Sequence, residues 1–204
     1  MIALCLSSIA AYAGSSSPEG SDVKKYDLGF YSTALGGLSL STGNNSSSFG
    51  TRVIYGGSLG VTLSKTIGFG GYVFNASKSN KETYYNTTTT YKYDTLFYGG
   101  EINYFYSSNL NAGVRVGFTN ISGNVDTGTT FAKTSYSQFT VGARVGYDFF
   151  LTNALALATE MDYFYLPAAT ASMDLTGINT TSSMTARVSS LSFINLLLGL
   201  RLSI

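Results

Sequence analysis

The charged residues with the clearest chemical potential in this sequence form two acid–base pairs. Centring a short turn on Ser108 sets Glu101 across from Arg115, and centring another on Thr152 sets Arg144 across from Glu160. A carboxylate and a guanidinium facing each other across a β-hairpin can form an ion pair. In a closed interior such a pair either holds the strands in register or rearranges as a gate. These residues therefore indicate ion pairing as their main chemical role.

Conventional catalysis has few candidates. The chain has no histidine, which excludes mechanisms built around an imidazole, and the single cysteine, Cys5, lies near the amino end. Zinc and haem sites are therefore not expected. Asp148, Glu160 and Asp162 could form a carboxylate cluster, but Asp148 is expected nearer the turns than the other two. We predict no enzymatic activity, no cofactor and no metal.

The element that must position these charges is clearest at the carboxyl end, in residues 194–204. Every second residue there is apolar, while Arg201 and Asn195 lie between them. A period of two is typical of a β-strand with two different faces. We interpret it as a strand with lipid on one side and a polar lumen on the other. The apolar face consists of Ile194, Leu196, Leu198, Leu200, Leu202 and Ile204.

The same alternation recurs along the chain. It predicts strands within residues 26–40, 52–63, 67–73, 96–104, 110–119, 138–149, 155–163 and 194–204. Short turns at 64–66, 107–109 and 151–153 alternate with long polar loops at 42–50, 75–90, 120–134 and 167–183. The fold class predicted is all-β: an eight-stranded antiparallel up-and-down transmembrane β-barrel.

Composition agrees with this prediction. Charged residues make up 11% of the chain, against about 25% in soluble domains. A net charge of +1 gives no field that would recruit nucleic acid. No apolar run approaches the roughly 20 residues of a membrane-spanning helix. The alternative is a soluble lipocalin- or avidin-like barrel, which would place its apolar residues inside. Here that face would surround the barrel and aggregate in water.

The amino end predicts export. Residues 1–13 are apolar and small and end in Ala11-Tyr12-Ala13, a cleavage-site pattern. They lack a positively charged region, which indicates a signal peptide truncated at its start; a disordered or buried segment is the alternative. Residues 14–25 are predicted as a flexible lead-in, and residues 26–204 as the barrel. The mature chain would then contain no cysteine.

From about Tyr26 to Ile204 the pattern resembles the small eight-stranded outer-membrane barrels of the OmpA/OmpX type. The resemblance implies a location in the cell outer membrane, within the envelope of a Gram-negative bacterium, and contact with outer-membrane lipid. It also implies that the barrel-assembly machinery reads the final strand, through Leu198, Leu200, Leu202 and Ile204. The family usually ends in an aromatic residue, where this chain ends in Ile204.

An eight-stranded barrel is barely wide enough for its own side chains, so charges inside it need partners. Asp27 and Arg201 are also expected to face inward near the turns, and inward glycines would leave room for arginine. We hypothesise a polar plug that holds the strands in register; simple packing and an ion gate are the alternatives. The six residues of this lumen charge network are Glu101, Arg115, Arg144, Glu160, Asp27 and Arg201.

These observations predict a structural or interaction role: a barrel that presents four surface loops around a plugged lumen. The loop at residues 78–91 mixes charge, tyrosine and threonine and could contact a surface ligand. Two alternatives remain. One is a porin-like narrow channel for ions or small hydrophobic solutes, and the other is a soluble ligand-binding barrel.

Overall fold

The computed structural model describes residues 28–42, 50–63, 66–84, 87–106, 109–127, 131–176 and 181–204. The expected signal peptide, the lead-in and Asp27 lie outside these residues. No helix within the described ranges is long and apolar enough to cross a membrane.

Almost all of the described chain is β-strand. The strands are β1 (Leu28–Thr42), β2 (Thr51–Leu63), β3 (Ile67–Tyr84), β4 (Thr87–Phe105), β5 (Leu110–Asp126), β6 (Phe131–Phe150), β7 (Leu155–Leu166), β8 (Ala169–Thr176), β9 (Thr181–Val188) and β10 (Leu191–Ser203). Every pairing among them is antiparallel.

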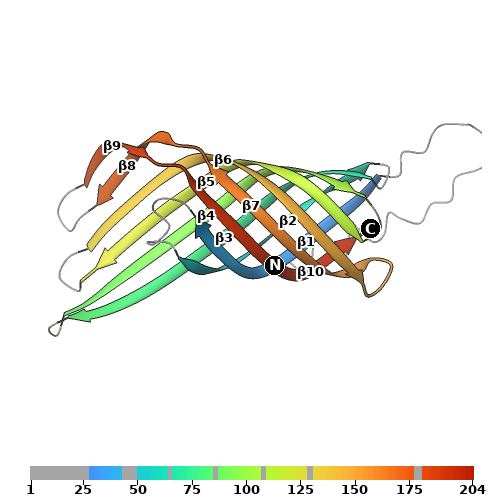
Figure 1. The fold of residues 1–204 in the computed structure, drawn as a ribbon, viewed down its shortest axis with the longest axis horizontal. Coiled ribbons are helices and arrows are strands. Elements are labelled where there is room, and N and C mark those ends of the chain that lie inside the picture. The colour runs from blue at the N-terminus through green and yellow to red at the C-terminus, as the bar shows by residue number, and fades with distance from the viewer. Residues whose placement is uncertain are drawn as a thin grey trace, which may run out of the picture.

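Strands β1 to β7 and β10 form a closed ring. Each of β1 to β6 pairs with the next strand, β7 pairs with β10, and β10 pairs with β1 along Tyr31↔Ser203 to Thr42↔Ser192. Strands β8 and β9 form a hairpin outside the ring that extends the sheet from β6. Figure 1 shows the tilted strands of the barrel with this hairpin at one end. The predicted eight-stranded antiparallel barrel is confirmed.

The two ends of the barrel differ. The turn end carries the β2–β3, β4–β5 and β6–β7 connections and the carboxyl terminus, and the hairpin end carries the β1–β2, β3–β4 and β5–β6 connections and the β8–β9 hairpin (Figure 1). Several segments predicted as loops at the hairpin end are strands instead. Strands β3 and β4 continue to Tyr84 and from Thr87, and β8 and β9 occupy much of residues 167–183. Polarity suggested loops, but threonine and tyrosine favour strands once a neighbour pairs with them.

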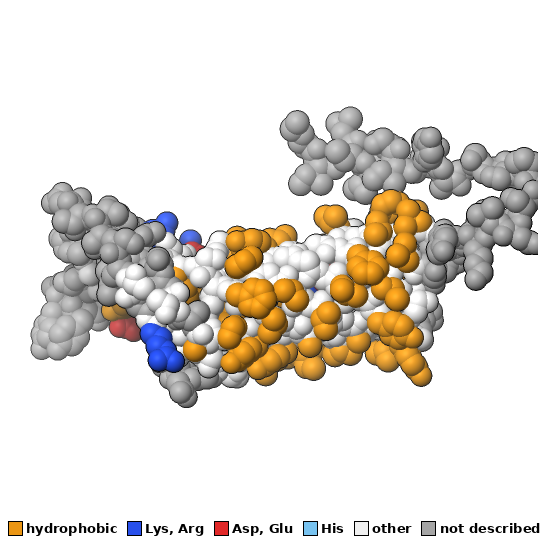
Figure 2. Space-filling view, turned by 90° about the horizontal axis from the view of Figure 1, so that it is seen from above, with side chains coloured by type: hydrophobic (Ala, Val, Ile, Leu, Met, Phe, Trp, Pro, Cys, Tyr) orange, Lys and Arg blue, Asp and Glu red, His pale blue; other side chains and the backbone are white. Residues whose placement is uncertain are grey.

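The outer face carries the apolar residues. Leu198, Val141 and Val114 are 54%, 37% and 51% exposed, whereas Arg144 and Glu160 are 3% and 4% exposed. Figure 2 shows hydrophobic side chains over the barrel, and the charged side chains that it displays lie at the hairpin end. On β6 the outward apolar run from Phe139 to Phe149 covers about 34 Å of strand, or about 26 Å of height at a tilt of about 40°. That matches the apolar band of a transmembrane barrel.

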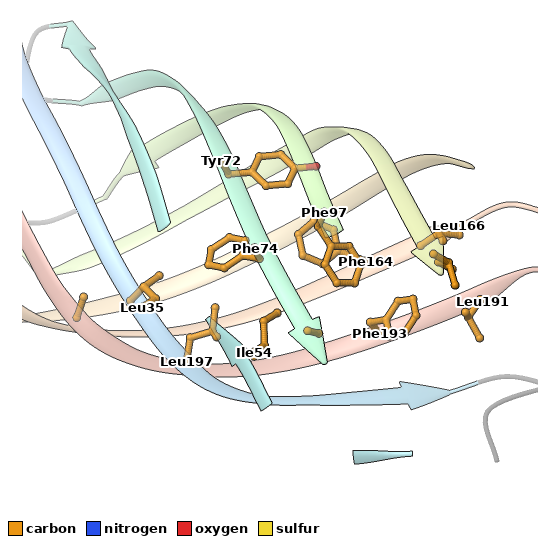
Figure 3. Packing of buried hydrophobic residues seen from close by; sticks show 13 residues of the cluster. Leu35, Ile54, Tyr72, Phe74, Phe97, Phe164, Leu166, Leu191, Phe193 and Leu197 are labelled. Atoms are coloured by element: carbon orange, nitrogen blue, oxygen red, sulfur yellow. The ribbon is translucent and has the colours of Figure 1, made fainter. Parts of the chain in front are cut away.

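The interior contains more than the predicted polar lumen. The half nearer the turn end is charged, whereas an apolar cluster occupies much of the half nearer the hairpin end (Figure 3). That half also buries Ser39, Arg52 and Asn195, so the lumen there is only partly polar, where the sequence predicted a polar lumen. Alternation along a strand assigns each residue to the inner or the outer face. It does not determine whether the inner face is polar or apolar at each position along the barrel axis. The cluster is built around Leu35, Ile54, Phe74, Phe97, Phe164, Leu166, Leu191, Phe193 and Leu197.

The outward band predicts a depth-dependent effect of an added charge. Val114→Arg places a guanidinium in the middle of the apolar run on β5 and should lower the free energy of unfolding by about 2–4 kcal/mol in bilayers. Ser137→Arg, which lies above the band on β6, is the control and should cost only about 0–1 kcal/mol. Urea unfolding in lipid vesicles, followed by circular dichroism, measures both. Equal losses would contradict the assigned lipid face.

Candidate functional site in the lumen

Glu101 and Arg115 face each other directly across the β4–β5 hairpin. Arg115 Nε donates to Glu101 Oε2 at 2.9 Å, and both side chains are fully buried. The register is set by a turn centred on residue 108, where the sequence placed it. The structure thus brings these two residues together in the lumen.

The second pair forms through a different register. Arg144 lies opposite Asp162, while Glu160 lies opposite Gly146. The prediction of Arg144 directly across from Glu160 is therefore wrong, because the β6–β7 connection is centred on residue 153 instead of Thr152. A shift of one residue in the turn centre moves each cross-strand pair by two. The long arginine side chain still reaches Glu160 diagonally, with Nη2 and Oε2 2.5 Å apart.

Arg115 joins the two pairs into one central network, which consists of Glu101, Arg115, Arg144, Glu160 and Asp162. Its Nη1 lies 2.8 Å from Glu160 Oε1 and 2.5 Å from Asp162 Oδ2. Arg144 Nη1 lies 3.6 Å from Glu101 Oε2. Three carboxylates from β4 and β7 thus surround two guanidinium groups from β5 and β6. The sequence had placed Asp162 on the inward face but had not assigned it to the network.

Arg201 belongs to a smaller group nearer the turn end. It forms a buried ion pair with Asp148, which also accepts a hydrogen bond from Asn111 Nδ2 at 3.1 Å. The expected partner of Arg201, Asp27, lies outside the described residues. Asp148 was missed as a network residue, although alternation along β6 places it on the same inward face as Arg144.

Neutral side chains complete the network. Tyr31 Oη and Asn103 Nδ2 each donate to Glu101 Oε1 at 2.8 Å. Arg144 Nη2 donates to Asn111 Oδ1 at 2.8 Å. A glycine makes the space that Arg144 uses, since a Cβ on Gly113 would lie 3.2 Å from Arg144 Cγ and 2.4 Å from Asn103 Oδ1. Of the inward glycines, Gly113 is thus one that lies beside an arginine, and it leaves room for Arg144.

An aromatic layer covers the central network on its hairpin side; it consists of Tyr72, Phe74, Phe97, Phe164 and Phe193 (Figure 3). The Arg115 guanidinium lies 4.9 Å from the ring centre of Phe74. Phe97 on β4 stacks on Phe164 of β7 at 4.8 Å and meets Phe193 of β10 edge-on at 5.2 Å. These rings bridge non-adjacent walls of the barrel. The sequence placed Phe97 inward, but the other phenylalanines fell at strand ends or in predicted loops.

Within the described residues no group of three or more aspartate, glutamate, histidine or cysteine side chains is suited to hold a metal ion. The carboxylates of the central network contact guanidinium groups instead. What the geometry can do is tie four strands together electrostatically and obstruct the lumen.

The fold is that of bacterial outer-membrane β-barrel proteins. No family model matches the sequence, and no curated protein matches it. A major outer membrane protein from Thermus thermophilus superposes with a TM-score of 0.64 at 12% identity, covering 88% of this chain and 100% of that chain. Neisserial surface protein A (NspA) gives 0.54 at 15% identity, covering 85% of this chain and 96% of its own.

Ail, the attachment invasion locus protein of Yersinia pestis, gives a TM-score of 0.55 at 8% identity, covering 87% of this chain and 98% of its own. Ail has also been crystallised with the heparin analogue sucrose octasulfate. The expected resemblance to small eight-stranded outer-membrane barrels is confirmed at the level of the fold.

Removing Arg115 tests the network. Arg115→Met leaves three buried carboxylates around one arginine and should lower the free energy of unfolding by about 3–5 kcal/mol. Adding Glu101→Gln and Asp162→Asn should restore part of the loss, because these changes remove the uncompensated charge. Urea unfolding in vesicles is the measurement. Lys92→Met is the matched control: the Lys92–Asp94 pair is largely exposed, so its loss should cost less than about 1 kcal/mol. A loss for Arg115→Met as small as the control's would contradict the assignment.

Proposed function

We propose that this protein is a non-catalytic outer-membrane barrel whose lumen is closed by two consecutive plugs and whose role is to present surface hairpins. The central network is the first plug and the aromatic layer is the second. The single observation that carries this proposal is that both plugs cross the lumen. Arg115 joins β5 to β4 and β7, and Phe97 joins β4 to β7 and β10.

The second plug argues against a simple salt-bridge gate. If the ion pairs exchanged partners, the stacked rings on their hairpin side would still obstruct the lumen. Phe74, Phe97, Phe164 and Phe193 are fully buried, so their rings are packed against neighbours. Moving them would expose apolar surface and open a void, which is costly in a close-packed interior. Conduction of hydrated ions therefore requires both plugs to open.

Planar-bilayer conductance tests this proposal with three variants. The wild-type protein should give no steady potassium or chloride current. Arg144→Met with Glu160→Gln weakens the first plug, and Phe97→Ala with Phe164→Ala removes the second; each pair alone should stay closed. All four substitutions together should conduct. A steady wild-type current would overturn the proposal, and a current from the first pair alone would favour an ion gate.

A second role, in surface interaction, is supported by the sheet at the hairpin end. Strands β3 to β6 remain paired well beyond the apolar band, as far as Tyr84↔Thr87 and Asp126↔Phe131. Strand β2 stops pairing with β3 at Ser77, and β9 pairs only with β8 among the described strands. Among the described strands, the sheet therefore has two edges without a neighbouring strand, to which a strand could be added. Ail, a protein named for attachment, shares the fold but shows nothing about this chain's ligand.

Proline substitutions in β9 test whether its edge binds a partner strand. The N–H groups of adjacent residues point to opposite sides of a strand, so Ala186→Pro and Arg187→Pro remove one donor from the free edge and one from the β8 ladder. Whichever of these two proline variants removes the donor from the free edge should reduce the adhesion of cells that express the protein at least several-fold. Arg187→Thr is the control for the lost side chain and should adhere normally. Unchanged adhesion in both proline variants would rule out this edge.

A further inference from the structure

Four inward polar side chains form one row along the lumen wall, at neighbouring positions on consecutive strands. Asp162 of β7 pairs with Asn195 of β10, Asn195 pairs with Ser39 of β1, and Ser39 pairs with Arg52 of β2. Asp162, Asn195 and Ser39 are 0% exposed and Arg52 is 2% exposed. This polar row starts in the central network and ends at a buried cation two strands beyond β10.

Among the residues that the structure describes, the two middle members of the polar row have no hydrogen-bond partner. This holds for Asn195 Nδ2, Asn195 Oδ1 and Ser39 Oγ. Buried amides and hydroxyls in proteins are bonded to protein or to ordered water, because an unsatisfied group keeps the full cost of desolvation. The two groups also lie between opposite charges, Asp162 on one side and Arg52 on the other. The space beside Asn195 and Ser39 therefore favours a polar molecule over an apolar one.

The polar row passes around the aromatic layer. Phe164 and Phe193 come next to Asp162 and Asn195 on the inward faces of β7 and β10, towards the hairpin end. Arg52, at the other end of the row, stacks on the Phe193 ring at 4.9 Å and donates to Thr95 Oγ1. The row thus leads from the network side of the rings to their edge.

We propose that Asn195 and Ser39 hold a file of water molecules that bridges Asp162 to Arg52 and carries protons past the aromatic plug. Cross-strand neighbours have Cβ atoms about 5 Å apart, a spacing that one water can bridge with two hydrogen bonds. The amide and the hydroxyl each both donate and accept, so the file can reorient. A proton enters on one water and another leaves at the far end, with no bond to the protein made or broken. Hydrated ions remain excluded.

Proton flux into vesicles tests the proposal directly. The wild-type protein, reconstituted into vesicles loaded with a pH-sensitive dye, should dissipate a pH gradient at least five times faster than empty vesicles. Asn195→Leu with Ser39→Ala removes the polar groups and should reduce that flux to the empty-vesicle rate. Asn195→Ser keeps a donor and an acceptor and should retain most of it. Potassium and chloride flux should stay at background in every sample.

The control removes buried hydroxyls elsewhere on the same strands. Thr33 and Ser58 bond to each other at 2.9 Å on β1 and β2, so Thr33→Val with Ser58→Ala should leave proton flux unchanged. The unfolding midpoint in urea gives a second readout that does not depend on flux. If waters satisfy Asn195 and Ser39, their apolar replacement lowers the midpoint; if the groups are merely unsatisfied, it raises the midpoint. A raised midpoint, or wild-type flux equal to that of empty vesicles, overturns the proposal.

Discussion

The interaction on which the rest of the structure depends is the burial of Arg115 among carboxylates. Its guanidinium contacts Glu101, Glu160 and Asp162 and also lies against the rings of Tyr72 and Phe74. A charge enclosed in a barrel is tolerated only with partners at contact distance, and those partners belong to other strands. One side chain thus constrains β3, β4, β5 and β7 at once. A slip of the β4–β5 pairing by one residue would turn Arg115 into lipid.

This constraint explains why the barrel has two kinds of interior. Close to Arg115, glycines and small polar residues leave room for long charged side chains and their hydrogen bonds. Further towards the hairpin end, no carboxylate of the central network is within reach, and stacked rings fill the same cross-section. Arg115 lies at the boundary, with ion pairs to the carboxylates and rings against its guanidinium. The apolar plug therefore packs directly on the charged one.

Much of this architecture could be predicted from the sequence, because the side-chain period of a strand is two whatever its partner. Alternation assigned Glu101, Arg115 and Asp162 to the lumen. It could not supply register at β6–β7, since that depends on whether the turn centre is residue 152 or 153. Loops were overestimated for a related reason: residues 78–84 are polar, and only their pairing with β4 identifies them as strand. The polarity of a segment indicates whether its side chains lie in water or lipid, whereas the length of a strand depends on how far it pairs with its neighbour.

Three of the four strands that carry the central network are also among those that project furthest from the band. Glu101, Arg115 and Arg144 lie on β4, β5 and β6, which remain strands to Thr87, Asp126 and Phe131 at the hairpin end. A paired sheet transmits register along its length, because each ladder hydrogen bond fixes the next. Ion pairs near the turn end therefore brace the base of the same sheet whose free part stands outside the membrane. The contacts that join β4, β5 and β6 in the lumen therefore also fix the register of the sheet at the hairpin end.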